Sequence, residues 1–154
     1  MKALSFWKAV TLDKSNLLEE VFALLQDNGV PFCVIGGQAV NAYVEPLVSL
    51  DLDLAVAVDQ LDQLRQLLQG HFQTEVFPHS VKVSSAGSNL RVQFQTDPWP
   101  VASIEDVLQG DLGATHPERH PTKRKKDLLD IERLVESYPA LRANVPEEIL
   151  LRLR

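Results

Sequence analysis

Two aspartates interrupt an otherwise apolar run in the first half of the sequence. Asp51 and Asp53 lie in LDLDLAVAV, residues 50–58, and Asp51 follows Gly37 by fourteen positions. In an extended strand successive side chains alternate between faces, so both carboxylates share one face and the leucines point to the other. Two carboxylates about 7 Å apart along a strand repel each other and are costly to desolvate together. Mg²⁺ relieves this cost by binding one or two carboxylates together with substrate phosphates, so the pair is a candidate metal site.

A glycine pair upstream of the aspartates can supply the complementary half of such a site. Gly36 and Gly37 follow the apolar segment PFCVIG and precede QAVNAYV, which is typical of a short helix. A helix N-terminus offers unpaired N–H groups and a positive dipole end to a phosphate, and glycine lets the ligand approach the backbone closely. The glycines are equally compatible with a plain tight turn, in which case the aspartates are solvated at the end of a sheet.

The elements that must position these residues alternate between helical and extended patterns. Ser15 is a candidate cap for a helix over 14–28, which has an apolar face and ends at Gly29. The other expected elements are strands at 31–36, 50–58, 72–77, 80–85 and 90–96, and helices at 38–44, 59–70, 103–110, 123–138 and 146–153. This order predicts an α/β or α+β fold with a mixed sheet flanked by helices. We expect one domain over residues 1–154, with its core at about 15–138 and a short C-terminal helix at 146–153.

Composition restricts the class of protein. The 154 residues are 45% hydrophobic and 23% charged, which is typical of a globular domain with a sizeable core. The net charge of −6 argues against broad, nonspecific binding to nucleic acid. Cys33 is the one cysteine, so we expect no disulfide framework, a reducing cytoplasm, and Cys33 as a small buried core residue. No apolar segment approaches the roughly 20 residues that cross a bilayer, so no membrane association is expected.

Together these motifs resemble the polymerase-beta-like nucleotidyltransferase superfamily and, within it, the small bacterial AbiEii-type and minimal nucleotidyltransferases. The resemblance rests on Gly36 and Gly37, on the pair Asp51 and Asp53, and on the segment KRKKDLLDIERLVE at 123–136, which is similar to the family's basic helix. It covers roughly residues 15–138 and implies the nucleotidyltransferase fold.

The resemblance also implies an activity. It is the Mg²⁺-dependent transfer of a nucleotidyl group from a nucleoside triphosphate to a hydroxyl of a protein or RNA acceptor. Asp51 and Asp53 would be the catalytic metal ligands, while the glycine pair and Lys123 or Lys126 would bind the triphosphate. Many members belong to toxin–antitoxin systems, so a partner protein of that kind is implied as well.

The sequence departs from the family pattern at three places. Leu47 and Ser49 stand where Arg-x-Thr is common, so a cation is lost while the Ser49 hydroxyl is kept for the nucleotide. The family's third carboxylate falls on LRVQFQT, where Gln93 best matches the position, and glutamine cannot act as a general base. Asp97, just past this strand, is a second candidate for the third carboxylate. Asp111 stands where many relatives have a lysine.

The basic segment at 123–126 has two interpretations. In the first, Thr122 caps a solvated helix on which Lys123 pairs with Asp127 and Lys126 with Asp130 at i,i+4 spacing. In the second, Lys123 or Lys126 reaches the triphosphate. In both, the helix buries an apolar stripe made of Leu128, Ile131, Leu134, Val135 and Tyr138.

Two functions are therefore consistent with the sequence. The chain is an active nucleotidyltransferase, weakened by the loss of its third carboxylate, or a non-catalytic module that acts as a nucleotide sensor or as a toxin–antitoxin partner protein. The side chains that face Asp51 and Asp53 from the strand of Gln93 discriminate between them. A carboxylate there favours the enzyme, and a neutral or cationic neighbour favours the module.

Overall fold

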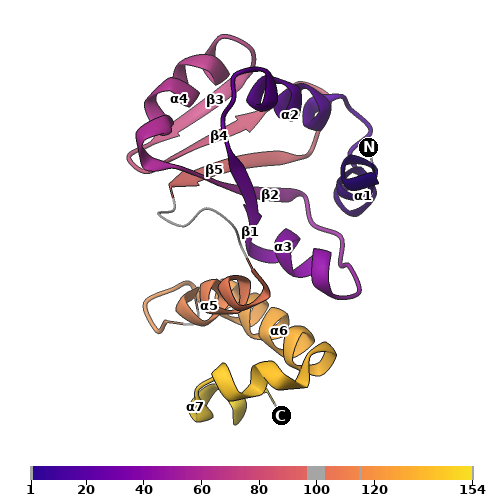
Figure 1. The fold of residues 1–154 in the computed structure, drawn as a ribbon, viewed down its shortest axis with the longest axis vertical. Helices are drawn as coiled ribbons and strands as arrows, with labels where there is room; N and C mark the ends of the chain where they lie inside the picture. The colour runs from indigo at the N-terminus through magenta and orange to yellow at the C-terminus, as the bar shows by residue number, and fades with distance from the viewer. Residues whose placement is uncertain (1, 97–102, 115, 154) are drawn as a thin grey trace. The chain divides into compact units, whose positions relative to one another are not determined.

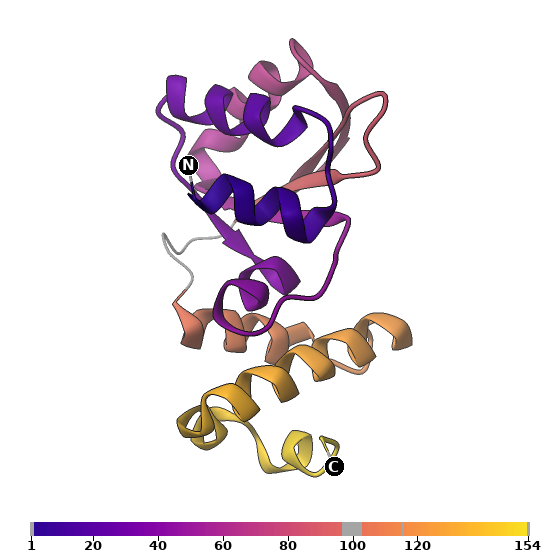
Figure 2. The same cartoon turned by 90° about the vertical axis from the view of Figure 1, so that its right-hand side faces the viewer.

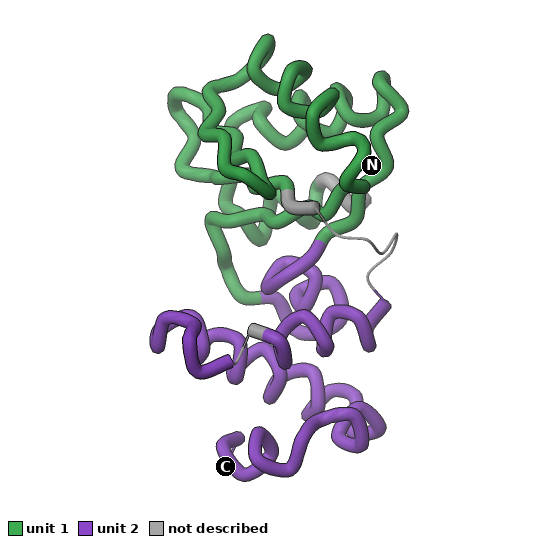
Figure 3. The backbone as a smooth tube through the Cα atoms, turned by 90° about the vertical axis from the view of Figure 1, so that its left-hand side faces the viewer, with its two compact units in different colours: residues 1–34, 47–101 green, residues 35–46, 102–154 purple. Residues whose placement is uncertain are grey.

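The computed structural model describes residues 2–96, 103–114 and 116–153, so Asp97 lies outside the described residues. Contacts within the chain divide it into two compact units (Figure 3). Unit 1 comprises residues 1–34 and 47–101, and unit 2 comprises residues 35–46 and 102–154. The expectation of one domain with its core at 15–138 stays a prediction.

A five-stranded mixed sheet forms the centre of unit 1 (Figure 1). Its strands are β1 (Phe32–Ile35), β2 (Asp51–Val56), β3 (Gln73–Phe77), β4 (Ser80–Ser84) and β5 (Arg91–Thr96), in the order β1-β2-β5-β4-β3. Strand β2 runs parallel to β5, whereas β5 with β4 and β4 with β3 are antiparallel. The predicted mixed α/β sheet is confirmed.

Helices pack against the apolar face of this sheet. They are α1 (Lys2–Thr11), α2 (Leu17–Asp27) and α4 (Leu61–Gln69), which follows the 3₁₀ turn η1 (Val58–Gln60). Leu52 and Leu54 of β2 and Phe94 of β5 are fully buried in one core with Leu18 of α2 and Leu64 of α4. Helix α1 lies beside α2 (Figure 2) and was not predicted. Because one face of the sheet is covered by these helices, its polar residues must lie on the other.

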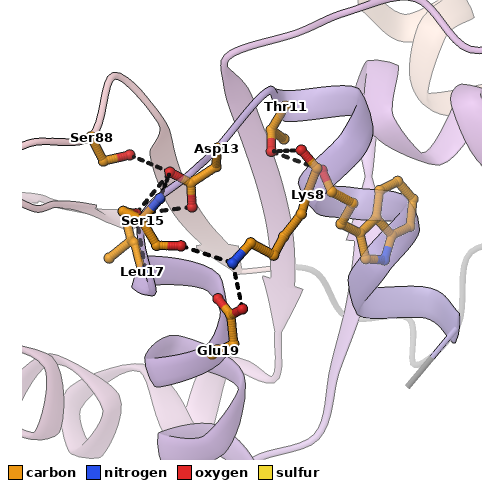
Figure 4. A network of polar contacts seen from close by, with 8 residues as sticks. Lys8, Thr11, Asp13, Ser15, Leu17, Glu19 and Ser88 are labelled. Atoms are coloured by element: carbon orange, nitrogen blue, oxygen red, sulfur yellow. Dashed lines mark hydrogen bonds and ion pairs between the residues drawn. The ribbon is translucent and has the colours of Figure 1, made fainter.

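A polar network joins the loop between α1 and α2 to the loop before β5 (Figure 4). The buried carboxylate of Asp13 accepts hydrogen bonds from Ser15 N, Ser15 Oγ and Ser88 Oγ. Ser15 Oγ in turn accepts from Leu17 N, but the cap residue of α2 is Asn16 and not the predicted Ser15, and Lys8 pairs with Glu19. The network therefore fixes the start of α2 against a segment far away in the sequence.

Unit 2 is helical. It contains α3 (Gly36–Tyr43), α5 (Ile104–Ala114), α6 (Pro121–Ser137), the 3₁₀ helix η2 (Pro139–Asn144) and α7 (Glu147–Leu150). Helices α3, α5 and α6 pack against one another, and their shared core includes Val40, Leu108, Ile131 and Leu134. Helix α3 is thus held by partners that follow it by more than 60 residues.

Several sequence expectations are corrected by the structure. Helix α3 begins at Gly36 itself, and α5 continues to Ala114 through residues expected to be a loop. Cys33 is half-buried rather than buried, since all of β1 is half-buried. Tyr138 is 41% exposed, and its hydroxyl donates to the Tyr43 carbonyl at 3.0 Å instead of joining the core.

The cap of α6 also differs from the expectation. The ring of His120, not the side chain of Thr122, accepts a hydrogen bond at the start of this helix, from Thr122 N at 3.3 Å. Across the described parts of the chain, no helix is both long and apolar enough to cross a membrane.

Candidate nucleotide site

The predicted carboxylate pair lies on β2 with the expected alternation. Leu52 and Leu54 are fully buried, Asp51 is exposed and Asp53 is half-buried. Both aspartates are therefore on the polar face of the sheet, because alternate residues of a strand share a face. We call Asp51 and Asp53 the carboxylate half-site.

The register of β2 and β5 determines what lies beside each carboxylate. Asp51 is opposite Arg91, and Asp53 is opposite Gln93. Gln93 thus occupies the place next to the carboxylate pair that the sequence assigned to a third carboxylate. The functional role of Gln93 stays a prediction. The strand register on which that prediction depends, with Gln93 opposite Asp53, is found in the structure.

Arg91 is the neighbour whose contact the sequence did not reveal. Its Nε lies 2.9 Å from Asp51 Oδ1, and the two side chains are 62% and 53% exposed. An exposed ion pair of this kind typically contributes about 0–1 kcal/mol, so Arg91 contacts Asp51 but can be displaced at little cost. The side chains that face the aspartates from β5 are therefore one cation and one neutral amide.

The same row of side chains continues across the sheet. Gln93 is opposite Lys82 of β4, and Lys82 is opposite Glu75 of β3. Lys82 Nζ lies 5.1 Å from the centre of the Phe77 ring, and Gln93 Nε2 is 3.5 Å from Ser80 Oγ. These side chains line a shallow hollow of about 300 Å³ together with Pro78 and His79.

Ser49 lies at the entrance of β2. Its hydroxyl donates to the Asp51 carbonyl at 3.3 Å and accepts from Asp51 N at 3.4 Å. Its N–H donates to the Val10 carbonyl, which fixes this segment to the end of α1. Leu47 is exposed. The predicted contact of Ser49 with a nucleotide stays a prediction.

The glycine pair forms the first turn of α3. Gly36 has φ +64°, a conformation that side chains disfavour, and the preceding cap residue Ile35 makes no side-chain hydrogen bond to the helix. The cap residue of α3 therefore supplies no side-chain acceptor to the first N–H groups of this helix. A Cβ placed on Gly37 would lie 2.9 Å from Lys126 Nζ and 3.4 Å from Asp130 Oδ2. The structure thus brings Lys126 of α6 to the start of α3.

Lys126 is the better placed of the two predicted lysines. Lys123 is exposed one turn earlier on α6, and the side-chain atoms nearest to the Gly37 position belong to Lys126 and Asp130. An exposed ammonium beside a helix N-terminus is a suitable arrangement for a phosphate. We call Gly36, Gly37 and Lys126 the phosphate half-site.

A hydrogen-bonded chain holds α6 against α3. Arg133 donates to Asp130 Oδ1 at 2.7 Å, to Asn41 Oδ1 at 3.0 Å and to the Glu45 carbonyl. Asn41 Nδ2 donates in turn to Gln38 Oε1 at 3.0 Å, and both amides are buried. The chain fixes the distance between Asp130 and the first turns of α3, and hence the position of Lys126 four residues before Asp130.

The expected i,i+4 pairs on α6 are replaced by other ion pairs. Asp130 pairs with Arg133, and Asp127 Oδ2 lies 3.2 Å from Arg119 Nε without the alignment of a hydrogen bond. Both carboxyls are buried rather than solvated, and burial raises the pKa of each above its ordinary value, although neighbouring cations act in the opposite direction. Lys126 is exposed, and its charge acts on both carboxyls.

Asp51 and Asp53 are the donor set available to Mg²⁺ on β2. Asp51 and Asp53 supply two carboxylates, which suffices for one ion completed by phosphate oxygens and water. The described residues include no group of three His, Cys, Asp or Glu side chains that could hold a metal. Among the described residues, the donor set therefore fits a single Mg²⁺ completed by a phosphate ligand.

No family model matches the sequence, and no curated protein matches it. The structure nevertheless has the nucleotidyltransferase fold. The crystal structure of ANT(2'')-Ia with adenylyl-2''-tobramycin is similar to it with a TM-score of 0.56 and 13% identity, over 90% of this chain and 95% of that chain.

Two further solved structures support the same fold. The lincomycin-bound lincosamide antibiotic adenylyltransferase LnuA gives a TM-score of 0.54 at 15% identity, over 76% of this chain and 93% of that chain. An antigenic nucleotidyltransferase-like protein from Paracoccidioides brasiliensis gives 0.52 at 16% identity, over 85% and 75%. At such identities the likeness establishes the fold alone, and the fold is the one that the sequence predicted.

Proposed function

We propose that the chain binds a nucleoside triphosphate with one Mg²⁺ and slowly transfers a nucleotidyl group to a hydroxyl acceptor. The observation that carries the proposal is the pair Asp51 and Asp53 on the polar face of β2, in a fold shared with nucleotidyltransferases. The start of α3, where Lys126 Nζ approaches Gly37, supports it.

Each group has a defined role in this proposal. Asp51 and Asp53 would hold the Mg²⁺, which when bound neutralises phosphate charge and polarises the phosphoryl group. The N–H groups of α3 and the Lys126 ammonium bind and orient the phosphates, and the Ser49 hydroxyl contacts the nucleotide. The acceptor oxygen bonds to the α-phosphorus as pyrophosphate leaves, and because Gln93 cannot accept a proton, the acceptor hydroxyl loses its proton to water. Because general-base help is typically worth 10²–10⁴ in rate, the transfer is slow.

The acceptor belongs to the proposal as well. The resemblance implies a protein or RNA hydroxyl in the cytoplasm, an AbiEii-type assignment and a toxin–antitoxin partner. Two neighbours in fold were solved with small molecules, adenylyl-2''-tobramycin in ANT(2'')-Ia and lincomycin in LnuA. Acceptor trials therefore include proteins, RNA and small hydroxyl compounds.

Thermal unfolding tests the nucleotide site. Ligand at about 100 times its dissociation constant stabilises a protein by roughly 2.7 kcal/mol, which we expect as a rise of several degrees in Tm with Mg²⁺ and a triphosphate. The double variant Asp51→Asn with Asp53→Asn should lose the Mg²⁺-dependent part of the rise. Without ligand, the free energy of unfolding of the double variant should be close to that of wild type, because the ion pair between Asp51 and Arg91 is exposed. No shift with any common triphosphate at millimolar concentration contradicts the proposal.

A non-catalytic nucleotide-binding module is the second candidate, and a specific observation favours it. Arg91 occupies Asp51, and Gln93 offers only a neutral amide to Asp53. A cation and an amide in these positions compete with Mg²⁺ and leave no base. Such a module would act as a nucleotide sensor or as a partner protein.

The variant Gln93→Asp separates the two candidates. It adds the missing negative charge beside Asp53, so we expect tighter Mg²⁺ binding and a higher rate of label transfer from a radiolabelled triphosphate. Arg91→Gln is the matched control, because it frees Asp51 without adding a carboxylate. Transfer that stays undetectable in wild type and in Gln93→Asp, with nucleotide binding intact, establishes the module. Robust wild-type transfer shows instead that another residue completes the site, Asp97 being the first to test.

A further inference from the structure

Three buried carboxyl groups meet between α5 and α6 of unit 2. We call Asp111, Asp127 and Asp130 the acid cluster; they are 5%, 7% and 3% exposed. Asp127 and Asp130 have the cationic partners Arg119 and Arg133. Asp111 Oδ2 is buried and has no hydrogen-bond partner among the residues described. A buried carboxyl oxygen without a hydrogen-bond partner is costly and needs an explanation.

The charges around Asp111 supply that explanation. Burial, followed by Asp130 and Asp127, raises the pKa of Asp111 to about 8, and Lys126 and Arg119 only partly oppose this. Helix α3 also packs against α5, and its sequence GGQAVNAY contributes no charged side chain. At neutral pH Asp111 therefore carries a proton.

The acid cluster adjoins the phosphate half-site directly. Lys126 Nζ and Asp130 Oδ2 are the side-chain atoms that converge on Gly37 in the first turn of α3. With Asp111 protonated, the cations around the acid cluster exceed its two carboxylates by two charges; they are Lys123, Lys126, Arg119 and Arg133. When Asp111 ionises, the excess falls to one charge, and a third carboxylate attracts Lys126.

We propose that Asp111 is a positioning residue whose proton leaves Lys126 available to a phosphate, so that a polyphosphate binds at the start of α3 with uptake of one proton by the acid cluster. The inference rests on the phosphate half-site of the proposed function. Coupling of this kind is reciprocal: the proton favours the anion, and the bound anion favours the proton. The proton comes from the buffer, and no bond other than that to the carboxyl oxygen is made.

Isothermal titration calorimetry with inorganic triphosphate and no metal tests the inference. Titrations from about pH 6 to about pH 9.5, in pairs of buffers with different ionisation heats, measure both affinity and proton uptake. For wild type we expect uptake that is largest near pH 8 and an affinity that falls up to about tenfold per pH unit above it. In Asp111→Asn the same titrations should show a flat affinity, after the ligand's own titration is accounted for. The control Glu105→Gln removes an exposed carboxylate from the same helix and should follow wild type.

The possible outcomes separate the claim of a phosphate half-site from the claim that Asp111 controls it. No binding by wild type at neutral pH removes the phosphate half-site and this inference with it. Binding with the same pH profile in wild type and in Asp111→Asn overturns the inference alone. If Asp111→Asn does not fold, the wild-type proton count decides: net uptake near pH 8 beyond that of the ligand supports the inference, and none overturns it.

Discussion

Asp51 and Asp53 share a face of β2 but have different electrostatic surroundings. Arg91 neutralises Asp51, and Gln93 presents a neutral amide beside Asp53. A cation that binds both carboxylates must displace Arg91, at a cost of about 0–1 kcal/mol for so exposed a pair. Metal binding at this face is therefore expected to be weak until a phosphate ligand adds its own oxygens.

The raised pKa of Asp111 predicts an unusual dependence of the free energy of unfolding on pH. Its folded pKa is raised to about 8, so between pH 4 and 8 the folded state holds a proton that the unfolded state has lost. The free energy of unfolding should fall through this range by up to about 1.4 kcal/mol per pH unit and level off above it. Asp111→Asn carries no such penalty, so urea unfolding should show a gain in stability that is small at pH 4 and grows toward pH 8. An equal difference at both pH values is the contrary result.

At the scale of elements, α3 and α5 contain glycines with opposite surroundings. A Cβ on Gly37 meets Lys126 Nζ at 2.9 Å, whereas a Cβ on Gly110 of α5 meets nothing within 4 Å. Both positions are helical, where alanine is typically about 0.5–1 kcal/mol better than glycine.

Gly37→Ala should therefore displace the flexible end of Lys126 and fill the approach to the α3 N–H groups. We expect it to leave the thermal stability of the free protein nearly unchanged but to remove most of the stabilisation by triphosphate. Gly110→Ala should raise the free energy of unfolding by about 0.5–1 kcal/mol and keep the response to triphosphate. A normal triphosphate response in Gly37→Ala would show that phosphates do not bind at this turn.

Local patterns in the sequence predict most of these elements, because apolar periodicity and turn residues are properties of short segments. The alternation in LDLDLAVAV correctly placed both aspartates on one face of β2. The pairing of Arg91 with Asp51 depends on the register of two strands 40 residues apart, which no local pattern specifies. The burial of Asp127 and Asp130 likewise depends on α3 and α5 packing against α6. The interpretation in which these two carboxylates are solvated was therefore wrong, since no local pattern shows that packing.

At the scale of the whole molecule, the polar network around Asp13 predicts how acid changes the free energy of unfolding. Burial alone would raise the pKa of Asp13, but hydrogen bonds from Ser15 and Ser88 and the charge of Lys8 together lower it. A lowered carboxyl pKa stabilises the fold above the unfolded value of 3.8 and loses this effect as pH falls through the folded value.

Asp13→Asn should therefore cost about 1–3 kcal/mol at pH 7, as expected for hydrogen bonds to a charged group, and much less below pH 4. Urea unfolding at the two pH values measures this, with the exposed Asp27→Asn on α2 as the matched control. A cost that is the same in acid and at neutral pH would mean that the charge of Asp13 contributes nothing.

The discontinuity of unit 2 has a consequence for protein synthesis. Residues 35–46 emerge from the ribosome with their packing partners still untranslated, since unit 2 resumes only at residue 102. Asn41 must wait for Arg133, 92 residues later, which at about 5–20 residues per second takes roughly 5 to 20 seconds. During that interval the amides of α3 stay hydrated, and the growing chain has no phosphate half-site. On the proposed function, a nascent chain would gain this half-site only after Lys126 of α6 has been translated and has reached the start of α3.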